Sequence, residues 1–367
     1  MSTTLYPESV DPVVTNARDI DPYLGTLSGE AGGQIAGPAD RHLERNVQPW
    51  ERLPEPLASD PTYYDRPLLK APVWSWEVPL YYYTGGAAGA CLVLGAAAQL
   101  DHSGELNRMV RRCHWAGIIG SGIAAVLLID DLGRPSRFLN MLRVFRPTSP
   151  MNVGAWILSG AAPTAIIAGI FLRRRGFWKL VGESSGFASG LFGMGLATYT
   201  GVLVGNTAIP VWQASRRILP LLFGASAIAS AGSLLNLFSE DAREGRITHM
   251  FGTVGRIAEI AAAIAMERQA SRVPLVGRPL RSGPSGFLWR AATVLTAASL
   301  IASLLPKRSR KKQAIAGVLG TAGSLALRYA VHTAGAASAR DPRATFHLQR
   351  NNSAGEQLRG GKNHDTL

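Results

Sequence analysis

Two adjacent carboxylates, Asp130 and Asp131, end one long apolar run of the chain, and a loop rich in arginine separates them from the next run. The arginines of this loop are Arg134, Arg137, Arg143 and Arg146. A carboxylate at a membrane boundary costs free energy unless it is paired or has a function. A nearby guanidinium can hold it ionised through paired hydrogen bonds, and we expect Arg134 to orient Asp131 in this way. The loop therefore indicates a functional site, with the alternative that the Asp131–Arg134 pair only fixes the loop.

The ends of four predicted helices should meet at the membrane surface that carries this loop. Glu77 precedes the first apolar run, and Asp131 ends the second. Asn152 opens the third run, and Tyr199 lies near the end of the fourth. A rim of carboxylates and phenols above apolar helices suits a ligand with a polar head and an isoprenoid tail. A quinone is the obvious candidate, because such groups can relay the protons of its reduction. The alternatives are helix capping for Asp131 and packing or interfacial anchoring for the tyrosines.

Long apolar blocks dominate residues 78–335, and about 20 apolar residues suffice to cross a bilayer as a helix. The blocks predict an all-α, polytopic membrane bundle of about eight transmembrane helices in two four-helix halves. The predicted spans are residues 78–99, 113–130, 153–172, 187–205, 218–238, 250–267, 286–305 and 314–335. The sixth span is interrupted by Arg256 and Glu259, which lie three residues apart and can pair on one helical face. Such a pair is tolerated when it faces protein or water instead of lipid.

A polar segment flanks the predicted membrane domain, residues 76–338, on each side. Residues 1–75 are rich in proline, and we expect an extended arm that contacts a partner, with a disordered tail as the alternative. The aromatic residues of this segment favour the arm, because disordered tails are poor in aromatics. Residues 339–367 form a polar C-terminal tail. The first residues show no signal peptide, so we expect the first helix to direct insertion.

The formal net charge of +13 comes largely from loops between the predicted spans. This distribution is typical of the positive-inside rule for membrane proteins, so we do not expect a nucleic-acid partner. An even number of spans places both termini on the same side of the cell's inner (plasma) membrane. The densest basic clusters favour both termini on the outside, although the loops on the other side are nearly as basic.

Residues that ligate redox cofactors are scarce in this chain. Its two cysteines, Cys91 and Cys113, are too few for an iron–sulfur cluster, which needs about four thiolates. Covalent haem requires a Cys-x-x-Cys-His motif, which is missing. His114 and His249 begin the second and sixth spans, and no histidine lies deep within a span, so we do not expect haem b. The sequence thus predicts no metal redox centre within this chain.

The loop and the helix ends around it resemble the NrfD/PsrC family, the polytopic membrane subunits of polysulfide reductase-like complexes. The motif runs from Asp131 to Trp156 and contains Asp-Leu-Gly-Arg-Pro, Arg-Phe, Met-Leu-Arg, Pro-Thr-Ser-Pro-Met and Gly-Ala-Trp. Residues 198–203, 208–212 and 219–226 look like further landmarks of the same family. The resemblance extends over about residues 74–340 and implies an eight-helix membrane anchor.

The resemblance also implies that the chain exchanges electrons with the membrane quinone pool, either menaquinone or ubiquinone. The implied partners are an iron–sulfur electron-transfer subunit and a molybdopterin catalytic subunit, as in polysulfide reductase or formate dehydrogenase. In the family the quinone lies where the first helix begins and the fourth ends, and the tyrosine of the fourth helix carries over to Tyr199. The expected quinone site also includes Trp76, Glu77, Tyr81, Asp130, Asp131 and Arg134.

Two other classes of function remain open at the level of sequence. A proton channel or transporter would use Arg256, Glu259 and Glu267 as relay residues in the second half of the bundle. A passive scaffold would hold its partners together around a degenerate quinone site. The sequence does not distinguish the partner's substrate, the direction of electron flow or whether protons are moved.

Overall fold

The computed structural model describes residues 20–21, 26–27, 69–101, 103–132, 136–172, 174–238, 242–305 and 309–346. The chain divides into two compact units, residues 1–50 and 51–367. In the first unit, β1 (Ile20–Asp21) pairs antiparallel with β2 (Thr26–Leu27). Most of the expected N-terminal arm, Arg134 of the loop and most of the expected C-terminal tail lie outside the described residues.

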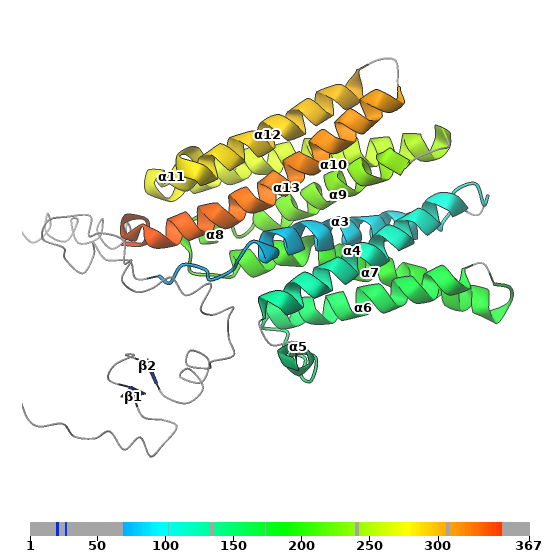
Figure 1. Ribbon diagram of the computed structural model, residues 1–367, viewed down its shortest axis with the longest axis horizontal. Coiled ribbons are helices and arrows are strands. Elements are labelled where there is room, and N and C mark those ends of the chain that lie inside the picture. Colours follow the sequence, from blue (N-terminus) through cyan, green and yellow to red (C-terminus); the bar gives the residue numbers. More distant parts are fainter. Residues whose placement is uncertain are drawn as a thin grey trace, which may run out of the picture. The chain divides into compact units, whose positions relative to one another are not determined.

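The described part of the second unit is helical. Its long helices are α3 (Glu77–Ala98), α4 (Asn107–Asp131), α6 (Pro150–Phe171), α7 (Phe177–Gly205), α9 (Leu219–Phe238), α10 (Ala242–Ala270), α12 (Gly283–Leu304) and α13 (Arg310–Arg340). The short helices are α5 (Ser136–Met141), α8 (Pro210–Ala214) and α11 (Pro274–Arg281). The long helices run alongside one another as a bundle (Figure 1), which confirms the prediction of an all-α architecture for this unit.

Six of the described helices are long and apolar enough to cross a membrane, namely α4, α6, α7, α9, α12 and α13. The chain is therefore an integral membrane protein with several membrane-spanning helices. The expected first and sixth spans correspond to α3 and α10, which do not meet the same measure of apolarity. The six helices agree with the predicted spans, whereas the total of eight stays a prediction.

The long helices pack as two four-helix rings with the same cyclic order. In the first ring α3 and α6 each contact both α4 and α7. In the second ring α9 and α12 each contact both α10 and α13. The rings meet where α3 contacts α9 and α13 and where α7 contacts α9, so α3 lies near the centre of the bundle (Figure 1). This position explains how α3 can carry tyrosines and glycines, because most of its residues contact protein and few face lipid.

Glycines bring the central helices into close contact. A Cβ atom on Gly89 of α3 would lie 2.4 Å from the carbonyl oxygen of Gly193 on α7. A Cβ atom on Gly232 of α9 would lie 2.3 Å from the Cα of Gly252 on α10. Small residues at such crossings let the backbones of membrane helices approach each other. The α3–α7 crossing also sets how these two helices align their tyrosines.

Successive long helices run in opposite directions, which gives the bundle two distinct ends. Gly117 of α4 lies against Leu92 of α3, and Gly120 lies against Ala88, as antiparallel packing requires. We call the end where α3, α6, α9 and α12 begin the site end. The end where these four helices finish is the far end. The short helices α5, α8 and α11 belong to the site end by their places in the chain (Figure 1).

Candidate functional site

Three tyrosines from two helices gather at the site end. Tyr81 and Tyr82 lie in the second turn of α3, and Tyr199 lies in the last turns of α7. The ring of Tyr81 meets that of Tyr199 edge to face with centroids 6.4 Å apart, and it lies 5.9 Å from that of Tyr82. All three side chains are buried. Because α3 and α7 are antiparallel, an early residue of one meets a late residue of the other, and we call Tyr81, Tyr82 and Tyr199 the tyrosine cluster.

The start of α6 packs against the ring of Tyr199. A Cβ atom on Gly154 would come within 2.0 Å of Cε2 of Tyr199, so only a glycine lets the ring lie against this helix. Two residues earlier, the side chain of Asn152 accepts from the backbone N–H of Arg146 at 2.7 Å. It also donates to the carbonyl of Val144 at 3.0 Å, and Ser149 caps the helix. The loop motif thus holds the start of α6 in the position that Tyr199 needs.

A buried arginine lies behind the tyrosine cluster. Arg328 of α13 is 1% exposed, and its guanidinium carbon lies 3.9 Å from the ring centroid of Phe223. Its Nη2 donates to the Phe223 carbonyl at 2.8 Å, and the Phe223 ring lies 5.8 Å from that of Tyr82. Sequence reasoning missed Arg328. The available signal was a single charged residue inside the apolar span 314–335, where an arginine is costly and is usually functional or structurally essential.

The carboxylates expected at this site take different positions. Glu77 is buried at the first turn of α3 and accepts a hydrogen bond from the hydroxyl of Ser75. Asp131, at the end of α4, is half-buried and interacts electrostatically with Tyr82, whereas Asp130 is exposed. Trp76 is 58% exposed, and its carbonyl accepts from the Tyr329 hydroxyl at 3.0 Å. Glu77 thus lies one helical turn before Tyr81 on the same face of α3, and Asp131 lies in electrostatic range of Tyr82.

Two hydroxyl groups of the cluster have unused hydrogen-bonding capacity. Among the residues that the structure describes, the phenol oxygens of Tyr81 and Tyr82 are buried and make no hydrogen bond. A buried polar group without a partner costs about 1–3 kcal/mol. Such groups call for an explanation, and a ligand or water that supplies the missing bond is a common one. The cluster is thus a closely packed aromatic site that lacks acceptors for its donors.

The second half of the bundle buries the polar residues that we expected to pair. Arg256 and Glu259 of α10 are 0% and 2% exposed, but within the described residues no ion pair joins them. Arg256 Nη2 donates to Ser233 Oγ on α9 at 3.0 Å. Glu259 accepts from Thr296 Oγ1 of α12 and Ser324 Oγ of α13, each at 2.9 Å. The expected pair is replaced by hydroxyl partners, because neighbouring helices present them to each side chain.

Glu267, the third expected relay residue, lies apart from Glu259. It follows Glu259 by eight residues, or about 12 Å along the helix axis, in the last turns of α10. Its carboxylate accepts from Arg281 Nε and from Trp289 Nε1, each at 3.2 Å. It is also partly exposed at 36% of the side chain. Glu267 thus fastens α10 to α11 and α12 at the site end.

The two large cavities that the structure describes lie at the far end, away from the tyrosine cluster. One, of 580 Å³, is lined by residues that follow α3 and by residues of α4, α6 and α7, and it includes His114. The other, of 410 Å³, is lined from α4, α9 and α13. His114 bonds to the Val110 carbonyl at 2.8 Å, and His249 bonds to the Ser303 carbonyl at 2.9 Å. Both imidazoles are therefore engaged with the protein backbone.

Comparison with known proteins agrees with the helical membrane architecture and with the loop motif. No match was found among curated proteins. The family model described as polysulphide reductase, NrfD, matches residues 67–338, which include seven of the long helices and all but the last two residues of α13. The match is consistent with a membrane subunit of an oxidoreductase complex. It spans well over half of the chain, which therefore belongs to the polysulphide reductase NrfD family.

Proposed function

We propose that this chain is the quinone-interacting membrane subunit of a multi-subunit oxidoreductase, with the quinone head held at the tyrosine cluster. The observation that carries the proposal is the convergence of Tyr81, Tyr82 and Tyr199 at the site end, with two buried hydroxyls that lack partners. Membership of the NrfD family supports the same proposal. The resemblance implies a quinone where the first long helix begins and the fourth ends, and the tyrosine cluster lies at this place.

The chemistry of the cluster fits a quinone head. A quinone offers two carbonyl acceptors on a flat ring, and the phenols of Tyr81 and Tyr82 are donors without acceptors. The ring of Phe223 packs against Tyr82, and Tyr199, whose ring meets that of Tyr81, contributes a third phenol that donates to a quinone oxygen. Menaquinone and ubiquinone share this head-group chemistry, so the proposal covers both. When bound, the quinone supplies a two-electron, two-proton couple to the complex.

Each residue of the site has a definable task. Tyr81 and Tyr199 orient the head group by hydrogen bonding and ring contact, and Gly154 fixes the place of Tyr199. Asp131 exchanges protons between the cluster and the surface of the site end. Arg328 lies one ring behind Tyr82 and favours negative charge in the cluster, because the charge interaction is strong in a buried environment.

In this proposal the quinone exchanges electrons with a partner protein, in either direction. Both cysteines of the chain are buried in the helical bundle and are too few for an iron–sulfur cluster. We therefore propose an iron–sulfur subunit docked at the site end, next to the tyrosine cluster, with a molybdopterin subunit behind it. The loop between α4 and α6 and the helices α8 and α11 make up much of the surface that such a partner would contact.

A second candidate function, proton movement, rests on the buried polar residues of the other half. Near the far end Thr248 donates to Asn236 of α9. One turn closer to the site end, Ser233 of the same helix accepts from Arg256. Glu259 follows on α10, and Arg328 lies in electrostatic range of it. Buried ionisable groups within a membrane bundle are the usual components of a proton relay. The series extends from the far end toward the tyrosine cluster.

Substitution of Tyr199 by Phe tests the quinone site in the purified complex. We expect the partners to co-purify in normal ratio while the KM for quinone rises about 3- to 10-fold, the value of one hydrogen bond. Tyr329→Phe is the matched control, because it removes a hydroxyl that bonds to the Trp76 carbonyl outside the cluster. The proposal would be contradicted if both variants kept the quinone kinetics of the wild type and lipid extracts of the complex contained no quinone.

A further inference from the structure

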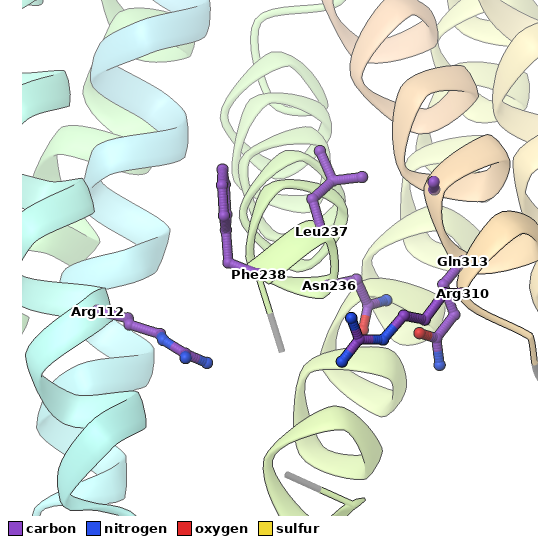
Figure 2. Close-up of a pocket in the computed structure, with 7 residues that line it drawn as sticks. Arg112, Asn236, Leu237, Phe238, Arg310 and Gln313 are labelled. Atoms are coloured by element: carbon purple, nitrogen blue, oxygen red, sulfur yellow. The ribbon is translucent and has the colours of Figure 1, made fainter. Parts of the chain in front are cut away.

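The 410 Å³ cavity at the far end is built from both halves of the bundle (Figure 2). Arg112 reaches toward it from α4 in the first half. Asn236, Leu237 and Phe238 line it from the end of α9, and Arg310 and Gln313 line it from the start of α13 (Figure 2). A ligand in this cavity would contact three helices that belong to different halves.

Two of the lining residues are arginines on opposite sides of the cavity. Arg112 is held in place by Glu244, both of whose carboxylate oxygens lie 2.9 Å from its Nη1. Arg310 is exposed in the first turn of α13. Guanidinium groups bind phosphate and carboxylate through paired hydrogen bonds. Glu244 offsets the charge of Arg112, so Arg310 supplies the net positive charge at the cavity. A guanidinium on each side with one net positive charge favours an anion with several oxygen atoms.

The start of α13 adds to the positive potential. This helix has 31 residues, and the Ser309 hydroxyl caps it by accepting from the backbone N–H of Lys312 at 3.3 Å. The N-terminal end of a helix carries a partial positive charge and attracts anions. The amide oxygen of Asn236 is engaged by Thr248, so its NH2 group is what this residue offers a ligand. The polar groups available to a ligand are thus mainly donors.

Apolar side chains adjoin these donors. Leu237 and Phe238 line the cavity and are 39% and 65% exposed. On α13 the next exposed apolar residues are Ile315 and Val318, at 55% and 60%. In a membrane-spanning helix such residues face lipid chains. The ligand that matches the whole arrangement has an anionic head and a hydrocarbon tail, a combination that basic sites between membrane helices bind.

We propose that this cavity binds the phosphate head group of an acidic phospholipid, between Arg112 and Arg310, with an acyl chain against Phe238. The lipid would bridge α4 to α9 and α13 and so tie the two halves together at the far end. The site is separate from the tyrosine cluster, and the proposal does not depend on quinone chemistry.

Native mass spectrometry of the full-length chain in mild detergent tests the proposal. The probes are phosphatidylglycerol and phosphatidylcholine with identical acyl chains. We expect selective retention of phosphatidylglycerol, weakened about fivefold in Arg310→Gln, the effect of one basic residue near anionic lipid. Lys311→Gln is the matched control, because Lys311 is the next residue of α13, is exposed and does not line the cavity. Its lipid retention should equal that of the wild type.

Three results would overturn the proposal. The first is equal retention of the two lipids by the wild type, and the second is an equal loss of phosphatidylglycerol retention in Arg310→Gln and Lys311→Gln. The third is displacement of phosphatidylglycerol by inorganic phosphate. The last would identify a soluble anion as the ligand. A second measurement needs no variant. Photoactivatable phosphatidylglycerol should label the peptides that contain Leu237 and Phe238, and labelling confined to other helices would also overturn it.

Discussion

The ring of Tyr199 lies directly against the backbone of Gly154, so that a methyl group at position 154 would come within 2.0 Å of the tyrosine Cε2. This contact links the loop motif between α4 and α6 to the tyrosine cluster. The motif looks at first like a set of catalytic groups. Part of it, Ser149, Asn152 and Gly154, instead positions the start of α6 so that the tyrosine of α7 can meet α3.

Substitution of Gly154 by Ala should displace Tyr199. Overpacking of this kind costs about 1–3 kcal/mol, so we expect a lower melting temperature together with a loss of quinone turnover. Gly122→Ala is the matched control, because a Cβ atom at Gly122 of α4 meets no atom within 4 Å. The measurement is thermal unfolding in detergent alongside quinone kinetics. Normal values for both in Gly154→Ala would show that Tyr199 does not depend on this contact.

Substitution of Arg328 by Met should destabilise the bundle. The change removes a charged donor from the Phe223 carbonyl, worth about 1.5–3 kcal/mol, and leaves Glu259 without its neighbouring positive charge. Arg328→Lys keeps the charge and should fall between Met and the wild type. Arg340→Met, at the exposed end of α13, is the control. A melting temperature of Arg328→Met at or above that of the wild type would exclude a stabilising role.

Substitution of Glu259 by Gln separates electron transfer from proton movement. The amide keeps an acceptor for Thr296 or Ser324, so we expect normal assembly and normal quinone turnover. Proton uptake or release across proteoliposomes should be lost, because the amide does not ionise. Glu267→Gln is the comparison, since Glu267 lies at the site end with Arg281 and Trp289. Proton movement that persists in Glu259→Gln argues against a relay through this residue.

The two cysteines provide a check on the packing of α3 against α4. Cys91 and Cys113 are 1% and 0% exposed, and a Cβ atom on Gly95 would lie 2.9 Å from the Cβ of Cys113. We expect neither thiol to react with a maleimide in the folded protein and both to react after denaturation in detergent. Rapid labelling of Cys113 in the folded chain would contradict the close contact between these helices.

Sequence patterns were sufficient for the architecture and for one part of the site. Hydrophobic length predicted the membrane helices, and the loop motif indicated the family that the comparison then matched. The alternation of helix direction placed Tyr81 and Tyr199 at one surface, and the structure brings their rings to 6.4 Å. That inference needs no knowledge of side-chain packing, because consecutive membrane helices connected by short loops must reverse direction.

The tertiary structure alone decided which helices are neighbours and which side chains they share. The central place of α3, the contact of Arg328 with Phe223 and the hydroxyl partners of Glu259 depend on contacts between residues far apart in the sequence. Arg328 and Phe223, for example, are separated by 105 positions. The Arg256–Glu259 pair expected from spacing does not form for the same reason. Spacing along a helix states which side chains can meet, whereas the competing partners on adjacent helices determine which ones do.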